Sequence, residues 1–417
     1  MSPATAVRAP GVPRTLALAL LARVPPSALG LLLVLQVRHL GHSYALAGLC
    51  SGACALGMAA FSPLLGRAID RLGQPFVLTL TGAIVTLAVA VFALLPSGTP
   101  TPLFVIVAAM IGAVQPPISS CVRVLWRRIL DREGFNALVT LDASLQELAF
   151  MTGPLVLISM ASATGAAVAL ASAGLLLGIS SLVFAGLPET RRLGGPRHHD
   201  EHAPVRPAGG ALSSPGVRLL LIVATAMGVA FGATELSIVT LADHLGQKPA
   251  TGLMFALWGV GSFIGGALWT RAHASDRDPV KAMAWLITAC GLGSLPLGAS
   301  PSIVVLGLGL AVAGAAIAPL FGVLYALMAD AAPEGTLTEA YTLETSAITG
   351  GMALGSATAG LVASSFGAPA TFVLAGAAYL LGAVATRMRR CDLADRVGAP
   401  GTSPTLHAAT AELAQPV

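Results

Sequence analysis

The sequence predicts an all-α polytopic membrane protein, with twelve transmembrane helices arranged as two six-helix pseudo-repeats. Of the 417 residues, 55% are hydrophobic and only 10% are charged, whereas an ordinary soluble domain carries about 25% charged residues. Apolar runs recur along the whole chain, and many are close to the ~20 residues that a helix needs to cross the hydrocarbon. The chain also matches itself after a shift of 202 residues, which indicates a duplicated bundle.

Charged or Gly- and Pro-rich segments separate the apolar runs and set the expected boundaries. The first run continues far beyond a signal-peptide core with no clear cleavage site, so we expect a retained first helix. The predicted domains are an N-terminal half (1–187), a solvated linker rich in Pro and Gly (188–216), a C-terminal half (217–390) and a disordered cytoplasmic tail (391–417). The expected spans are 15–37, 44–65, 76–95, 103–125, 137–160, 164–187, 217–240, 250–270, 281–298, 302–328, 339–363 and 368–387.

The positions of Lys and Arg predict the orientation. If both termini are cytoplasmic, nineteen of the 23 Lys and Arg residues lie in cytoplasmic segments, and the opposite side keeps only Arg38 and Lys248. The other two, Arg23 and Arg123, fall inside helices. The positive-inside rule therefore favours an N-in/C-in topology. The scarcity of Lys and Asn beside abundant Ala, Gly and Arg is typical of a GC-rich bacterial gene, so we expect a multi-pass protein in the lipid bilayer of the bacterial inner membrane.

The internal repeat predicts how the two halves work together. The shift of 202 residues places "TLDAS" (140–144) on "TLETS" (342–346) and Gly30 on Gly232. Two parallel six-helix halves joined by a cytoplasmic linker describe a rocker-type secondary transporter.

Other function classes lack their sequence machinery. The chain has no phosphate-binding glycine loop with its lysine, so ATP-driven transport is not predicted. No catalytic triad or metal-ligand spacing indicates an enzyme, and the five cysteines form no CxxC pair. The run "RHHDEH" (197–202) is interpreted as chance histidines in a solvated linker. We therefore expect no cofactor, no metal, no nucleic-acid partner and a monomeric protein.

A loop motif adds a family resemblance, which extends over residues 14–390. The segment "GRAIDRLGQ" (66–74) resembles the cytoplasmic signature Gly-x-x-x-Asp-Arg-x-Gly of the major facilitator superfamily, carried here by Gly66, Asp70, Arg71 and Gly73. The resemblance implies that Asp70 and Arg71 help to latch the two halves together in the outward-facing state. An acid near a neighbouring helix N-terminus is favoured by about 0.3–1 kcal/mol, which a cycling transporter can break. In the alternative, these are only solvated loop charges.

Two further family features are incomplete in this chain. Where the family often has Arg-x-x-Gln-Gly in the fourth helix, the sequence reads "GAVQPP", with Gly112 in place of the arginine and Gln115 retained. In the fifth helix, Gly153 and Pro154 resemble the Gly-Pro signature of exporters that exchange substrate for protons, without its flanking glycines. We expect a bend there, near the interface between the halves. The resemblance implies a drug- or metabolite-exporter-like protein, without a coupling scheme that needs the missing arginine.

A charge near the bilayer centre costs about 2.5–3.5 kcal/mol, so charged residues inside helices need partners. Asp142 lies ~9 Å into the fifth span, and Arg123 lies near the same end of the fourth. An ion pair across this hairpin would satisfy both residues. The shift places Glu344 on Asp142, which favours an architectural role, and a gating or coupling role is the alternative.

Glu147 is the acid expected closest to the membrane centre, ~16 Å into the fifth span. The shift places Thr349 on it, so the shared architecture does not require an acid there. Its expected partner is Arg23, ~14 Å into the first span. Two hypotheses remain open. The two residues form a permanent buried pair, or Glu147 exchanges a proton or binds a cationic substrate as the cavity switches sides.

Three further polar residues are candidates for the transport pathway. Glu235 lies ~25 Å into the seventh span, where it is either a snorkelling acid near the outer face or a substrate-site acid. Gln36 and Gln115 are predicted to line the cavity or to form ordinary interhelical hydrogen bonds. Because intramembrane charges are few, we expect a largely apolar cavity.

The leading functional hypothesis is a secondary active transporter that moves a small organic solute by alternating access. Proton-coupled efflux of a hydrophobic or amphipathic compound is the preferred direction. The alternatives are a nutrient uptake permease and a transport-inactive membrane sensor on the same fold. Measured flux separates these hypotheses.

Overall fold

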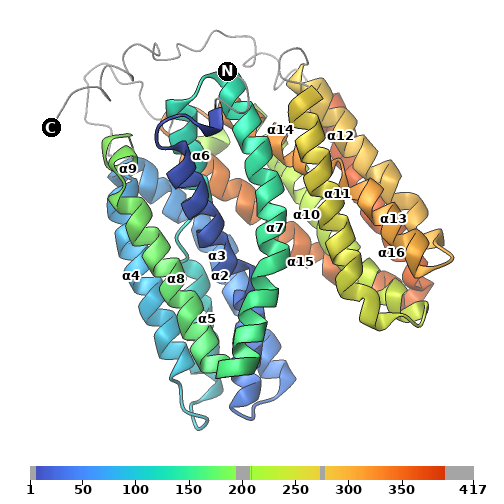
Figure 1. Cartoon of the computed structure of the whole chain (residues 1–417), viewed down its shortest axis with the longest axis horizontal. Helices are drawn as coiled ribbons and strands as arrows, with labels where there is room; N and C mark the ends of the chain where they lie inside the picture. The colour runs from blue at the N-terminus through green and yellow to red at the C-terminus, as the bar shows by residue number, and fades with distance from the viewer. Residues whose placement is uncertain (1–5, 194–206, 208, 273–277, 390–417) are drawn as a thin grey trace.

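The computed structural model describes residues 6–193, 207, 209–272 and 278–389. The predicted tail (391–417) and the histidine-containing run (197–202) lie outside the described residues. Within this part of the chain, twelve helical segments are long and apolar enough to cross a membrane. Each corresponds to one of the predicted spans, so the all-α polytopic fold is confirmed (Figure 1).

The N-terminal half contains six spans. They are α2 (Val12–His39), α3 (Tyr44–Leu72), α4 (Gln74–Ala93), α5 (Thr101–Ala113) with α6 (Ile118–Ile129), α7 (Arg132–Thr164) and α8 (Ala166–Gly186). The C-terminal half repeats this order. It contains α10 (Pro215–His244), α11 (Thr251–Ala272), α12 (Pro279–Ser294) with the 3-10 turn η3 (Leu295–Ala299), α13 (Ile303–Gly314) with α14 (Ile317–Ala331), α15 (Leu337–Phe366) and α16 (Ala368–Met388).

The fourth and tenth spans are interrupted, which the sequence analysis did not predict. The fourth is broken between α5 and α6 at Gln115, Pro116 and Pro117, because each proline lacks the N–H that would continue the helix. The tenth is broken at residues 315–316, and Pro319 removes the bond to the carbonyl four residues earlier. Pro117 and Pro319 correspond under the shift of 202 residues, so the two breaks fall at nearby positions of the repeat. Interrupted helices in corresponding positions are typical of transporter binding regions.

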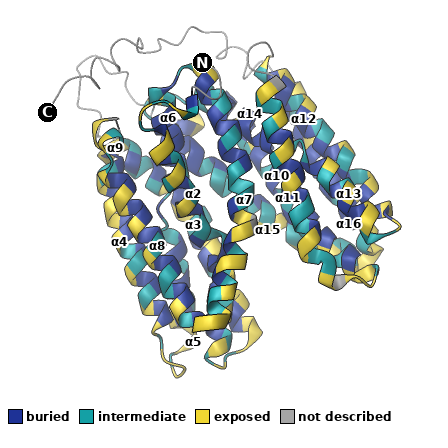
Figure 2. Ribbon diagram, in the orientation of Figure 1, coloured by how far each residue is buried: buried dark blue, intermediate teal, exposed yellow. Residues whose placement is uncertain are grey.

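Side chains on the outside of the bundle are apolar. Figure 2 shows exposed residues along the outer faces of α4 and α8. Large hydrophobic residues there include Leu87 and Leu182, which are 65% and 45% exposed, and Val312 on α13 is 77% exposed. An apolar surface of this extent is expected where lipid replaces water.

The two halves meet mainly at one end of the bundle. We call this end the terminal side, because α2 begins there and α16 ends there, and we call the other end the open side. The pairs α3–α15, α7–α14 and α7–α11 make the main contacts between the halves. The ribbons of the two halves diverge towards the open side (Figure 1).

Glycines at repeat-related positions set the packing inside each half. A Cβ on Gly153 of α7 would lie 2.1 Å from the Ser27 hydroxyl of α2, and a Cβ on Gly355 of α15 would lie 2.0 Å from the Val229 carbonyl of α10. These close approaches place α7 against α2 and α15 against α10. The helix α7 continues through Pro154, and Gly153 lies at a contact within one half instead of at the interface between the halves.

The described ends of the segment between the halves are partly buried. They contain the short helix α9 (Pro188–Leu193) and the 3-10 turn η1 (Gly210–Ser213). Thr190 and Ala211 have no exposed surface, which differs from the fully solvated linker that was expected. The reason is that both ends of the segment pack back onto the bundle at the terminal side.

Candidate functional site: a buried charge network, a latch and two facing acids

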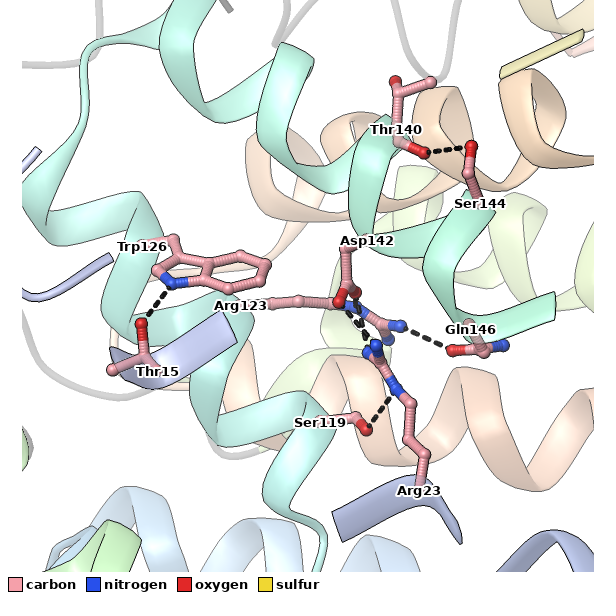
Figure 3. Close-up of polar contacts among 9 residues, drawn as sticks. All are labelled: Thr15, Arg23, Ser119, Arg123, Trp126, Thr140, Asp142, Ser144 and Gln146. Atoms are coloured by element: carbon pink, nitrogen blue, oxygen red, sulfur yellow. Dashed lines mark hydrogen bonds and ion pairs between the residues drawn. The ribbon is translucent and has the colours of Figure 1, made fainter. Parts of the chain in front are cut away.

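A charge network lies inside the N-terminal half, centred on Asp142 (Figure 3). Arg23 of α2 donates from both terminal guanidinium nitrogens to the Asp142 carboxylate, at 2.6 and 2.8 Å. Arg123 of α6 donates from Nε to the same carboxylate at 3.2 Å and from Nη2 to Gln146 Oε1 at 3.2 Å. Arg23 Nε also donates to the Ser119 hydroxyl at 3.2 Å. Asp142 has no exposed surface, so its charge is balanced by two guanidinium groups.

These contacts confirm one predicted pair and correct another. The Arg123–Asp142 ion pair across the α6–α7 hairpin is present. The expected Arg23–Glu147 pair is wrong, because Arg23 forms its ion pair with Asp142. Glu147 lies five residues after Asp142 on α7. Arg23 already binds both carboxylate oxygens of Asp142. A bidentate Arg–carboxylate contact fixes both partners in one orientation, so Arg23 belongs to the network.

Glu147 therefore has no cation beside it. Within the described residues it forms no hydrogen bond or ion pair, and the same holds for Glu235 on α10. Both side chains are half-buried. The two carboxylates are close enough to interact electrostatically, although they belong to different halves. Two acids without cationic partners among the described residues thus lie on α7 of one half and α10 of the other.

The motif residue Asp70 connects the two halves. Its carboxylate accepts hydrogen bonds from the backbone N–H groups of Thr338 (3.2 Å) and Glu339 (2.9 Å) in the first turn of α15. This geometry is the one that favours an acid at a helix N-terminus. Gly66 permits the approach, because a Cβ there would lie 2.9 Å from the Glu339 Cα. Gly73 ends α3 in a left-handed conformation, with φ of +88°.

The cation of this latch is Arg67 rather than Arg71. Arg67 Nε donates to Glu339 Oε1 at 2.6 Å, whereas Arg71 is exposed and forms no hydrogen bond or ion pair within the described residues. Arg67 lies one turn before Arg71 on the face of α3 that meets α15. Glu339 also accepts a hydrogen bond from the Ala211 backbone N–H at 3.3 Å, so the segment between the halves joins the latch.

A second cross-half contact lies beside the first. Asp330, at the end of α14, accepts from Arg127 at 3.1 Å and from Arg132 at 2.8 Å. Sequence reasoning did not single out Asp330 or Glu339. Both acids are next to helix ends at the terminal side, and the arginine excess on that side was the available signal.

Close packing of α5 against α3 explains why Gly112 stands where the family often has an arginine. A Cβ on Gly112 would lie 1.8 Å from the Cys54 carbonyl of α3, so α5 packs there without room for a side chain. Its counterpart Gly314 meets the Trp258 carbonyl in the same way, at 2.4 Å. Gln115 is half-buried at the break itself. Gln36 is 2% exposed and donates to the Ala93 carbonyl at 3.0 Å, so it forms an interhelical hydrogen bond.

Two repeated six-helix halves that touch at one end, with charged latches there, are the architecture of a class of helical membrane transporters. A family model described as Major Facilitator Superfamily matches residues 16–271 and 220–410. The chain therefore belongs to the major facilitator superfamily. A search of the curated proteins by sequence found no match.

Solved structures share the fold over almost their full length. The human organic anion transporter MFSD10 (TETRAN) aligns with a TM-score of 0.68 at 19% identity, covering 90% of this chain and 100% of the other. A bacterial homologue of the iron transporter ferroportin, in an outward-facing state, gives 0.70 at 15% identity, covering 90% and 98%. The transporter FucP, in an outward conformation, gives 0.66 at 14% identity, covering 91% and 99%. At these identities the likeness establishes the fold alone.

Proposed function

We propose that this transporter exports a small hydrophobic or amphipathic solute across the bacterial cytoplasmic membrane in exchange for protons. The observation that carries the proposal is that Glu147 and Glu235, one in each half, have no cationic partner among the described residues. A buried charge without a partner is costly, so such a carboxylate is stabilised either by a proton or by a ligand. A carboxylate that alternates between these two states can couple the movement of a solute to that of a proton in the opposite direction.

The position of the two acids fits alternating access. Glu147 belongs to α7 of one half and Glu235 to α10 of the other, so a rocking motion changes both their separation and their contact with water. Structural acids are held by arginines, as Asp142 is. Glu147 and Glu235 are instead free of arginine contacts among the described residues, so they can bind a proton or a ligand, which supports a role in transport.

The orientation proposed for the membrane is N-in/C-in. Arg67, Arg127 and Arg132 lie at the terminal side, where they bind acids of the other half, whereas Arg38 and Lys248 lie at the open side. This asymmetry favours a cytoplasmic terminal side. With that orientation, the described state is closed to the cytoplasm and outward-facing.

The surroundings of Glu235 favour an apolar or amphipathic substrate. Phe231 lies one turn before Glu235 on α10 and packs against Trp258 and Phe321, with ring centroids 5.1 and 5.7 Å apart. Aromatic faces beside a carboxylate suit a ligand with an apolar body and one polar or charged group. A sugar would require a denser set of hydrogen-bonding side chains.

The test is substrate-triggered proton movement in everted membrane vesicles that contain the protein. Export by exchange predicts that adding a substrate, found by screening amphipathic compounds in an efflux-deficient host, releases protons from acidified vesicles. Proton movement in the same direction as the solute would indicate a symporting permease instead. Solute flux without proton movement would overturn the coupling, and no flux with any compound would favour a transport-inactive sensor.

A further inference from the structure

Glu344 is a third acid without a partner among the described residues, and it lies in the closed interface rather than in the pathway. It belongs to α15 and is 1% exposed. Its Oε2 atom is buried and has no hydrogen-bond partner, and no hydrogen bond or ion pair joins Glu344 to any described residue. A carboxylate desolvated in this way is costly unless it is neutralised.

The internal repeat shows what Glu344 lacks. It is the counterpart of Asp142, which binds two arginines. The counterparts of those arginines in the C-terminal half are Tyr325, for Arg123, and Thr225, for Arg23. The half that carries Glu344 therefore provides no guanidinium for it.

The nearest cation comes from the other half and is already engaged. Arg123 interacts electrostatically with Glu344, but its guanidinium lies 3.5 Å from the centre of the Tyr325 ring and 5.8 Å from that of Tyr341. Its hydrogen bonds go to Asp142 and Gln146. The ring faces stabilise the cation where it is.

The charged and titratable groups around Glu344 come from several helices. They are Arg123 of α6, Arg23 of α2, Asp142 of α7, Tyr325 of α14 and Tyr341 of α15. Arg67 and Asp70 of α3 contact Glu339, which lies more than one helical turn before Glu344 on α15. Arg218 of α10 and Arg387 of α16 are exposed. Arg23, Arg123 and Asp142 together carry one excess positive charge. That charge offers Glu344 attraction at a distance but no hydrogen bond.

We propose that Glu344 is a proton-binding residue that holds a proton while the terminal side is closed. When the halves separate there, Arg123 leaves with the N-terminal half and water reaches Glu344, which then releases its proton to the compartment at that side. Closure requires the reverse step, uptake of one proton by the carboxylate. Protonation therefore favours closure, and lowering the pH on the terminal side increases the closed fraction. The inference rests on the proposed alternating access, but it requires no substrate.

The experiment measures closure directly. Spin labels are placed at Arg192 of α9, which packs against the N-terminal half, and at Lys281 of α12 in the C-terminal half. Both residues are exposed at the terminal side, and the native cysteines of the chain are replaced. The separation of the two labels is measured in lipid nanodiscs between pH 5 and pH 9. In the wild-type background the ratio of closed to open molecules should fall as the pH rises, by up to about tenfold per pH unit for one linked proton.

Two variants decide the result. Glu344→Gln imitates the protonated acid, so the closed population should dominate at every pH, whereas Glu344→Asp should keep the pH dependence. Glu133→Gln, which removes an exposed acid at the start of α7, is the matched control and should behave as the wild type. The proposal is overturned if Glu344→Gln keeps the wild-type pH dependence, populates the open state, or fails to fold. Because no solute is present, these outcomes are independent of whether protons drive export.

Discussion

Arg23 and Asp142 form a two-pronged ion pair within the N-terminal half, with N···O distances of 2.6 and 2.8 Å. Both residues are almost completely buried, and the contact joins α2 to α7. A pair of this kind holds two helices in one arrangement, so it moves as part of a rigid half.

Removal of the Asp142 charge should destabilise the protein strongly. Asp142→Asn leaves Arg23 and Arg123 buried without their shared anion, and loss of one member of a buried pair costs about 3–5 kcal/mol. The measurement is the free energy of unfolding by titration with a denaturing detergent. Gln146→Ala, which removes only the 3.2 Å contact to Arg123, is the control and should cost about 1 kcal/mol. Equal stability of Asp142→Asn and wild type would contradict a structural role.

The latch should depend on Arg67 and not on Arg71. Arg67→Ala removes the 2.6 Å ion pair between Arg67 and Glu339 across the two halves, so the ratio of closed to open molecules should fall about two- to fivefold. Arg71→Ala should leave the ratio unchanged, because that side chain is exposed. Spin-label distances across the terminal side measure both. An equal effect of the two variants would show that the latch depends on the total positive charge at this end of α3 and not on the specific Arg67–Glu339 ion pair.

A methyl group at Gly66 should prevent full closure. Its Cβ would lie 2.9 Å from the Glu339 Cα and 3.0 Å from the Thr338 carbonyl oxygen, and overpacking of this kind costs about 1–3 kcal/mol. Gly66→Ala should therefore expose cysteines introduced at the α3–α15 contact to a water-soluble maleimide. Gly52→Ala on the same helix meets no atom within 4 Å and controls for helix propensity. Labelling that is equally slow in both variants would refute the close-packed latch.

A side chain at Gly112 should be tolerated poorly. Its Cβ would lie 1.8 Å from the Cys54 carbonyl, so Gly112→Ala should lower stability by about 1–3 kcal/mol, and Gly112→Arg should prevent accumulation in the membrane. Gly48→Ala, on α3 in open space, is the comparison. Normal amounts of folded Gly112→Arg would mean that the arginine seen elsewhere in the family fits here too.

The sequence was sufficient for the twelve spans, because long apolar runs and charged breaks reflect the bilayer itself. It did not predict the breaks in the fourth and tenth spans, because the apolar runs continue across both of them. In the tenth span no proline stands at residues 315–316, and Pro319 acts one turn later. The shift of 202 residues relates Asp142 of α7 to Glu344 of α15, which are the fifth spans of the two halves.

The pairing of charges could be predicted only in part. Arg123 and Asp142 lie on adjacent helices of one hairpin, so depth alone brought them together. Arg23 is at a depth close to that of Glu147. Its partner depends on which face of α2 carries the side chain, and an estimate of depth does not give that face. The contacts of Asp70 and Arg67 with Glu339 join residues about 270 positions apart, so no local sequence pattern predicts them.

The central claim is that Glu147 couples solute movement to protons, and its most direct test is solute export measured against pH. Proteoliposomes containing wild type, Glu147→Gln or Glu133→Gln, each with an imposed proton gradient, are compared for transport of one substrate from pH 5.5 to pH 8.5. We expect gradient-driven transport for wild type and Glu133→Gln, and for Glu147→Gln a loss of at least tenfold that no pH restores. Wild-type transport by Glu147→Gln, with unchanged pH dependence, would show that Glu147 does not couple transport to protons.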